Sequence, residues 1–258
     1  MRAAACGQPT FVFFPHAGGS PLSVGRLAAA LPGSAGVAAV RLPRGDERAP
    51  GEPPRRAAAA ADLLAQELAG FPSRQGAGES PRLVLVGNSY GALLAYETAH
   101  RLACHATFPE RLIVSGFRAP MLAPAEAPLH LLPPHRLRIE LAARFGAAPP
   151  EVPAGQAGGL ETALRADLEA CETYRHTHAE PLAVPIDVLH MTEDASLSAA
   201  DLRAWEAATT APMRIVRCAV GHFPWTTHPQ EMARVLDQLA QGTQPACVPP
   251  TTTTVHSE

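Results

Sequence analysis

The chain is organised around residues 83–99, LVLVGNSYGALLAYETA, where an apolar run meets an alanine- and leucine-rich run at G-N-S-Y-G, residues 87–91. The apolar run predicts a buried strand, and the second run predicts a helix that begins directly after it. Such a sharp turn holds the central serine in a strained conformation, and the flanking glycines remove Cβ atoms that would collide with their neighbours. The pattern therefore predicts that Ser89 is a nucleophile exposed at the positive end of a helix.

Strand-like and helix-like patterns alternate along most of the chain. Apolar runs predict strands at 11–14, 37–42, 83–86, 111–117, 186–190 and 213–220. Helical spacing marks 21–31, 55–68, 160–174, 201–209 and 231–239, and polar loops are expected at 43–54 and 71–81. This alternation predicts an α/β fold with a mostly parallel central sheet, flanked by helices and joined by right-handed crossovers.

The pattern changes at Arg118, where repeated prolines break any long element. Residues 129–145 suggest short helices with apolar faces, and 160–174 form an amphipathic helix pattern. We predict a core made of residues 1–117 and 180–242, with a helical lid inserted at 118–179. Residues 243–258 are polar and low in complexity, and we expect them to be a disordered tail.

Composition excludes several classes of function. The formal net charge of −3 gives no general attraction to nucleic acid or to an anionic membrane, and no apolar run reaches the length of a membrane span. All 21 basic residues are arginine, which excludes a lysine nucleophile. The five cysteines are scattered without a C-x-x-C, and the N-terminus is too short for a signal peptide, so we expect a reduced, cytoplasmic chain.

Two later residues complete a possible catalytic triad with Ser89. Asp194 lies just past the predicted strand at 186–190, and His222 follows the last predicted strand and a glycine. A serine hydroxyl group needs a base to take its proton, a histidine can take and return that proton, and a carboxylate fixes the histidine tautomer. The order Ser89, Asp194, His222 is the one found in α/β-hydrolases.

Other residues compete for these roles. Glu193 adjoins Asp194 and is the alternative acid, whereas Asp187 lies inside a predicted strand and His228 is expected at the surface. The pair His176 and His178 could bind a metal, but no third ligand is suitably spaced, and a solvated helix end is the preferred interpretation. We expect no metal site. Cys104 and Cys171 are interpreted as packing residues.

A glycine pair, Gly18-Gly19, follows the first predicted strand. It does not form the G-x-G-x-x-G of a dinucleotide site. Together with the motif around Ser89, it favours a loop that donates a backbone N–H to an oxyanion. His16 could shape this loop or contact substrate. His16, Asn88 and Phe223 are the residues that we expect to bind substrate.

Six stretches together resemble type II thioesterases, the discrete editing thioesterases of modular polyketide and nonribosomal peptide synthases. They are FFPHAGGS at 13–20, GNSYGALLAYE at 87–97, LRADLEACETY at 164–174, MTED at 191–194, AWE at 204–206 and GHFPW at 221–225. The resemblance covers about residues 11–240. The motif at 164–174 favours this family over esterases and peptidases of the same fold.

The resemblance implies an α/β-hydrolase that removes acyl groups from the phosphopantetheine arm of an acyl or peptidyl carrier protein. Ser89 would attack the thioester, His222 would act as base and acid, and Asp194 would orient His222. Backbone N–H groups of Ala17 and Tyr90 would hold the oxyanion. No cofactor is implied, and we expect a monomer.

The chain departs from the family pattern at the two variable positions around Ser89, where Asn88 and Tyr90 stand in place of the usual histidine and methionine or leucine. The stretches at 43–48 and 191–194 differ as well. We therefore hypothesise an altered substrate scope. An acyltransferase or cyclase with the same triad, a small-ester hydrolase and a non-catalytic binding protein stay open as alternatives.

Overall fold

Six parallel strands form the central sheet of the computed structural model, which describes residues 2–42, 54–70, 82–103, 108–146, 157–243 and 245. The strands are β1 (Pro9–Phe14), β2 (Gly36–Ala39), β3 (Arg82–Asn88), β4 (Arg111–Ser115), β5 (Ile186–Met191) and β6 (Met213–Cys218). Their order is β2-β1-β3-β4-β5-β6, and every neighbouring pair is parallel. The predicted α/β fold with a mostly parallel sheet is confirmed.

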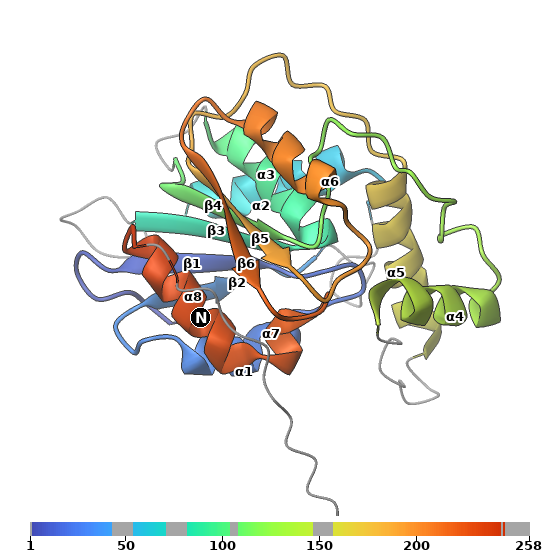
Figure 1. Cartoon of the computed structure of the whole chain (residues 1–258), viewed down its shortest axis with the longest axis horizontal. Helices are drawn as coiled ribbons and strands as arrows, with labels where there is room; N and C mark the ends of the chain where they lie inside the picture. Colours follow the sequence, from blue (N-terminus) through green and yellow to red (C-terminus); the bar gives the residue numbers. More distant parts are fainter. Residues whose placement is uncertain are drawn as a thin grey trace, which may run out of the picture.

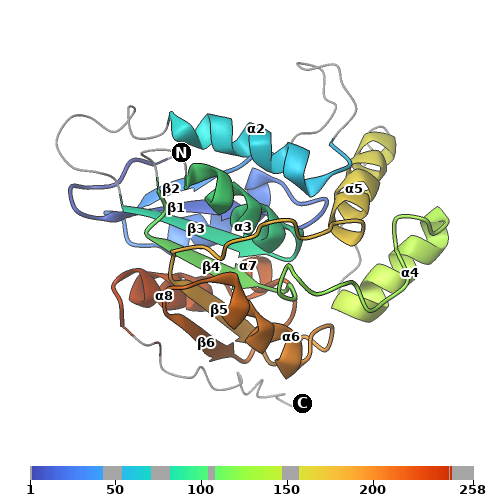
Figure 2. The ribbon, with the colours of Figure 1, turned by 90° about the horizontal axis from the view of Figure 1, so that it is seen from above.

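Helices cover both faces of this sheet (Figures 1 and 2). One face packs against α2 (Ala57–Ala69), α3 (Tyr90–Leu102), α6 (Ala199–Arg203) and the 3₁₀ helix η3 (Ala204–Ala208). The other packs against the 3₁₀ helix η1 (Pro21–Val24), α1 (Gly25–Ala30), α7 (Pro224–Thr227) and α8 (Pro229–Ala240). Coverage on both faces explains why the strands appear in the sequence as unbroken apolar runs rather than as alternating patterns.

The predicted lid segment contains α4 (Pro134–Phe145) and α5 (Ala157–Glu172), which lie together beside one end of the sheet (Figures 1 and 2). A small apolar cluster of its own joins the two helices, and it consists of Leu129, Leu137, Leu141 and Leu168. Arg165 on α5 also donates to the carbonyl groups of His130 and Leu132, which precede α4.

Several element boundaries differ from the predictions. The predicted helix at 21–31 is split into η1, whose first turn is capped by the Ser20 side chain, and α1. The strand predicted at 37–42 ends at Ala39, and the helix predicted at 160–174 ends at Glu172. The short helix α7 has no predicted counterpart.

No helix among the described ranges is long and apolar enough to cross a membrane. The predicted loops at 43–54 and 71–81 lie outside the described residues, except residue 54. The predicted tail at 243–258 also lies outside them, except residues 243 and 245.

A buried ion pair network ties the last three strands together. Asp187 on β5 accepts hydrogen bonds from Arg111 on β4 (2.8 Å) and from Arg214 on β6 (2.5 Å), and its side chain is 1% exposed. Asp187 is therefore a structural residue of the sheet and not a catalytic acid. Removing one partner of a buried ion pair is costly because the other charge is left uncompensated.

We expect Asp187→Asn to lower the free energy of unfolding by about 3 kcal/mol, measured by urea denaturation. Glu110→Gln is the matched control, because Glu110 pairs with Arg82 while both side chains are more than one-third exposed. The control should lose less than about 1 kcal/mol. Equal losses in the two variants would contradict the structural role of Asp187.

Candidate active site

Ser89 occupies the turn between β3 and α3 with φ 55° and ψ −125°. It is the only residue other than glycine with a positive φ in the described part of the chain. Its backbone is held on both sides, since its N–H donates to Ser115 O (2.8 Å) and its carbonyl accepts from Ala92 N (2.9 Å). The predicted strained serine is therefore present in the structure, at the N-terminus of a buried helix.

The glycines around Ser89 are required by close approach of the backbone. A Cβ atom on Gly91 would lie 1.9 Å from Phe14 O, and one on Gly87 would lie 2.3 Å from Gly91 O. Phe14 ends β1 and is in register with Gly87 on β3. The close contact between Gly91 and Phe14 thus places the loop that follows β1, residues 15–20, directly beside Ser89.

Asp194 and His222 form a buried pair on the loops that follow β5 and β6. His222 Nδ1 lies 2.7 Å from Asp194 Oδ2, and both side chains are at most 3% exposed. The two loops are bound to each other by backbone hydrogen bonds from Thr192 to Cys218 and from Glu193 to Val220. With Nδ1 of His222 bonded to a carboxylate, Nε2 is the nitrogen left to act as a base.

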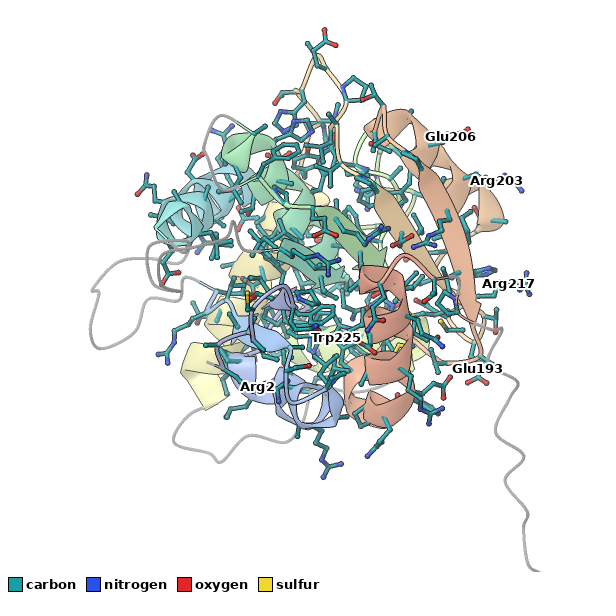
Figure 3. All side chains as sticks on the ribbon, turned by 90° about the vertical axis from the view of Figure 1, so that its left-hand side faces the viewer. Arg2, Glu193, Arg203, Glu206, Arg217 and Trp225 are labelled. Atoms are coloured by element: carbon teal, nitrogen blue, oxygen red, sulfur yellow. The ribbon has the colours of Figure 1, made fainter. Side chains whose placement is uncertain are left out.

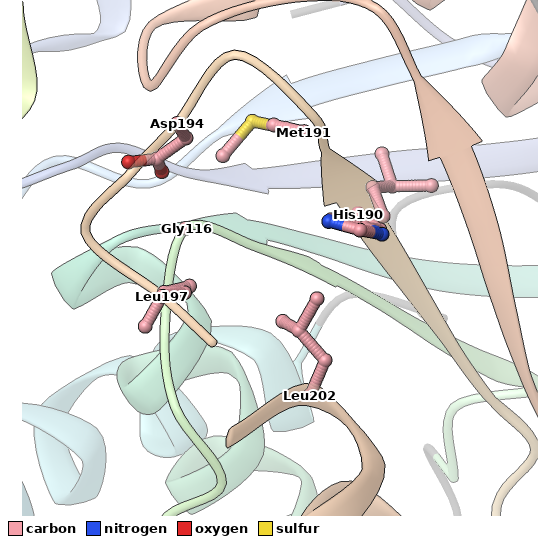
Figure 4. Close-up of a pocket in the computed structure, with 7 residues that line it drawn as sticks. Gly116, His190, Met191, Asp194, Leu197 and Leu202 are labelled. Atoms are coloured by element: carbon pink, nitrogen blue, oxygen red, sulfur yellow. The ribbon is translucent and has the colours of Figure 1, made fainter. Parts of the chain in front are cut away.

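The environment of Asp194 favours its charged form. Burial alone would raise the pKa of Asp194, but the hydrogen bond and charge of His222 and the hydrogen bonds from Ser196 outweigh burial and lower the pKa. Ser196 donates to Asp194 Oδ1 through its N–H (3.0 Å) and its hydroxyl group (2.6 Å). Figure 4 shows Asp194 beside a small hollow lined mainly by apolar groups, among them Met191, Leu197 and Leu202.

Asn88 links the turn at Ser89 to His222. Its side-chain N–H₂ donates to His222 O (3.1 Å), and its Oδ1 accepts from the Ser115 hydroxyl group (2.7 Å). The side chain is 1% exposed. The prediction that Asn88 contacts substrate therefore does not fit its position, because the amide faces the interior and holds the ends of β3 and β4 and the loop of His222 together.

Aromatic rings surround His222. The ring of Phe145, the last residue of α4, lies 4.4 Å from the His222 ring, and Phe223 packs edge-on against both His222 and His16. His16 Nδ1 is also 2.9 Å from Ala17 O, so His16 shapes the loop after β1. Substrate contact by His16 and Phe223 stays a prediction.

The two predicted oxyanion donors lie on the two segments that come together where Gly91 approaches Phe14 and Pro15. Ala17 lies in the loop after β1, and Tyr90 is the first residue of α3. Among the described residues, no acceptor is hydrogen-bonded to the backbone N–H of Ala17 or Tyr90. The Tyr90 side chain is 2% exposed. Burial, followed by the nearby groups of Asp167 and Cys171, raises the pKa of its hydroxyl group well above its usual value.

The alternative residues lie elsewhere or serve other purposes. Glu193 is exposed at the edge of the molecule, whereas Trp225 lies in the interior (Figure 3). His228 precedes α8, and its Nδ1 lies 2.9 Å from the Thr227 hydroxyl group in an exposed contact. Cys171 packs against the core, and burial raises the pKa of its thiol to about 12, which makes it a neutral packing residue.

His176 and His178 do not form the predicted solvated helix end. They belong to the extended segment after α5 and are half-buried against α3, where Glu97 is 3% exposed. His178 Nε2 lies 2.8 Å from Glu97 Oε1, which also accepts from the Tyr174 hydroxyl group (2.5 Å), and Arg101 donates to Oε2. The buried carboxylate attracts these partners because burial without them would be costly. No group of three potential ligands suited to a metal occurs in the described ranges.

Fold and site together define the class of protein. A strained serine after a central parallel strand, followed by a buried Asp–His pair on the loops after two later strands, is the arrangement of an α/β-hydrolase. All of these groups lie beyond the ends of parallel strands. Ser89 follows β3, next to the point at which the strand order reverses between β1 and β3, and such points are where open α/β sheets bind their ligands.

Comparisons with known proteins give the family. A family model described as "Thioesterase domain" matches residues 9–240. The "Probable cadicidin biosynthesis thioesterase" of Streptomyces griseus is 30% identical over 240 residues, which cover 91% of this chain and 62% of that protein. "Thioesterase PikA5" of Streptomyces venezuelae is 32% identical over 215 residues, covering 82% of this chain and 74% of that protein. The chain thus spans less than two thirds of the Streptomyces griseus relative.

A solved structure shows the same similarity. The type II thioesterase BorB, from the borrelidin biosynthetic cluster, superimposes with a TM-score of 0.72 at 29% identity, covering 94% of this chain and 95% of BorB. The chain belongs to the thioesterase domain family, and its predicted similarity to type II thioesterases is confirmed.

The lowered pKa of Asp194 predicts how stability depends on pH. A carboxylate whose pKa is lower in the folded state contributes stability above its usual pKa of about 4, and this contribution is lost as the pH falls through the folded value. We expect Asp194→Asn to be less stable than the wild type at about pH 7, with a difference that shrinks towards about pH 3. Urea denaturation across this range measures the difference.

Glu193→Gln is the matched control, since Glu193 is the exposed neighbour on the same loop. Its stability should follow that of the wild type across the range. A difference between Asp194→Asn and the wild type that stays constant with pH would contradict the favoured charge on Asp194.

Proposed function

We propose that this protein hydrolyses acyl thioesters carried on the phosphopantetheine arm of acyl or peptidyl carrier proteins in polyketide or nonribosomal peptide biosynthesis. The observation that supports it most directly is that Asn88 binds the backbone of His222, so the serine turn and the Asp194–His222 pair are held as one unit. Membership of the thioesterase domain family supports the choice of a thioester substrate. The names of the relatives, which refer to biosynthetic pathways, support a carrier-bound acyl group.

The proposed reaction follows from the roles of these groups. Ser89 Oγ attacks the thioester carbonyl carbon while His222 Nε2 takes the hydroxyl proton, and Asp194 stabilises the resulting imidazolium. The carbonyl oxygen becomes an oxyanion held by the N–H groups of Ala17 and Tyr90. The intermediate collapses, the carbon–sulfur bond breaks, and His222 returns the proton to the pantetheine sulfur.

The second half of the reaction repeats these steps with water. His222 takes a proton from a water molecule that attacks the acyl–Ser89 ester. The second oxyanion collapses, the carbon–oxygen bond to Ser89 breaks, and His222 returns the proton to Ser89 Oγ as the free acid leaves. These steps use only side chains, backbone N–H groups and water, so we propose that no metal or redox cofactor takes part.

We also propose a monomer that works in the cytoplasm. A single chain carries every group that the reaction uses, and its scattered cysteines suit a reducing compartment.

The position of Phe145 keeps acyl transfer as a second candidate. Its ring lies against His222, which is 3% exposed, so an apolar group covers the base that would activate water. An acyl–Ser89 ester that is shielded from water could instead be attacked by a hydroxyl or amine group of the substrate or of an acceptor.

Incubating a panel of acyl carrier proteins with wild type and with Ser89→Ala tests both candidates. By mass spectrometry we expect the wild type to release the free acid and the unloaded carrier protein. Ser89→Ala should be slower by at least ~10³-fold, because a triad without its nucleophile retains little of its activity. A cyclic or transferred product would favour the second candidate. A strong preference for p-nitrophenyl esters over carrier-bound thioesters would overturn the proposal.

A further inference from the structure

A carboxylate on the lid helix α5 is bonded to the loop that follows β1. Asp167 Oδ2 accepts a hydrogen bond from Gly18 N (2.8 Å), and this bond joins residues 149 positions apart in the sequence. Asp167 is 4% exposed. A carboxylate is buried only where partners compensate for its loss of solvent, so the contacts of Asp167 within the protein are part of the structure.

The loop at this point has a conformation that depends on its neighbours. Gly18 has φ +70°, and a Cβ atom on it would lie 3.0 Å from Leu164 Cδ1, one helical turn before Asp167. Gly19 N donates to His16 O (2.8 Å), which closes a tight turn. The side chain of Ala17 packs against the leucine cluster of the lid. α5 therefore contacts Gly18 through the polar side chain of Asp167 and the apolar side chain of Leu164.

The helix that carries Asp167 also packs near Tyr90, the residue of the second proposed oxyanion donor. Tyr90 lies at the start of α3, and its buried hydroxyl group is influenced by the charge of Asp167. α5 packs against α3 as well as against the loop. Asp167 is thus bonded to the loop that carries Ala17 and belongs to a helix that packs against α3, the helix that begins at Tyr90.

We propose that Asp167 is a positioning residue that fixes the Ala17 N–H in the geometry needed to bind the oxyanion, so that the lid helix α5 forms part of the oxyanion hole. This inference rests on the proposed function. An oxyanion hole accelerates a reaction only when its donors are held in place beforehand. A negative charge near an oxyanion is unfavourable in itself, so the contribution assigned to Asp167 is geometric.

Three variants test this proposal. Asp167→Ala removes the acceptor of the Gly18 N–H, and we expect kcat to fall about 10- to 100-fold. Asp167→Asn keeps an oxygen acceptor at the same place and should restore kcat to within about 3-fold of the wild type. Glu169→Ala is the matched control, because Glu169 lies on the same helix and binds Arg55 instead of the loop (2.5 Å). Its kcat should change by less than about 2-fold.

A binding measurement separates positioning from a general effect on the lid. In the Ser89→Ala background, the dissociation constant for an acyl carrier protein should be the same with Asp167 and with Asp167→Ala, since the oxyanion exists only after attack. A loss of binding that equals the loss of kcat would overturn the proposal. So would Asp167→Asn being as slow as Asp167→Ala, or Glu169→Ala being equally slow. Circular dichroism at the assay temperature checks that each variant is folded.

A fluorophosphonate probe tests the geometry without a thioester. Ser89 Oγ bonds to phosphorus, His222 takes the serine proton, fluoride leaves, and the phosphoryl oxygen occupies the oxyanion hole. Asp167→Ala should slow this labelling about 10- to 100-fold, whereas Asp167→Asn and Glu169→Ala should label like the wild type. If the wild type is labelled but hydrolyses no thioester, the proposed function is wrong. The labelling rates of the variants then still test the positioning role of Asp167. Equal labelling rates for all variants would overturn the inference alone.

Discussion

The contact between Gly91 and the Phe14 carbonyl is the constraint on which the site depends. At 1.9 Å from that oxygen there is no room for a Cβ atom, so α3 can follow β3 only with glycine at position 91. The turn leaves Ser89 in a positive-φ conformation, which costs on the order of 1–3 kcal/mol. Burial of α3 offsets this cost, because 11 of its residues are buried between the sheet, α2 and α5.

The parallel sheet determines which groups meet at Ser89. Every strand ends at the same edge, so the loops after β1, β4, β5 and β6 all reach the turn that follows β3. Asn88, at the end of β3, binds Ser115 at the end of β4 and His222 in the loop after β6. These two bonds require a side chain with both a donor and an acceptor. The amide suits this position, since a carboxylate could not donate to the His222 carbonyl.

Local patterns in the sequence were enough to predict the strands, their parallel arrangement and the residues that lie directly after them. Ser89, Asp194 and His222 are of this kind, because a strand end is visible in the sequence and fixes where the next residues lie. Asp194 adjoins Glu193, and only the structure shows which of the two carboxylates turns inward to His222.

Contacts between distant segments could not be predicted in this way. Helical periodicity places Asp167 and Phe145 on helices, but their partners, Gly18 and His222, come from other parts of the chain. The segment after α5 shows the same limit. Half-buried and exposed residues alternate from Tyr174 to His178. The half-buried side chains of Tyr174 and His178 bind the buried Glu97 on α3, a contact that the sequence of this segment does not indicate.

The two helices of the predicted lid segment are attached to the core in different ways. α5 is bonded to the loop after β1 through Asp167 and to Arg55 through Glu169, and the segment after it is bonded to α3. α4 is joined to α5 by the leucine cluster, and Phe145 at its end lies against His222. The helix that is bonded to the loop after β1 is therefore distinct from the helix whose last residue lies against His222. Under the proposed mechanism, changes in α4 would alter the space around the acyl group while α5 keeps the oxyanion donors in place.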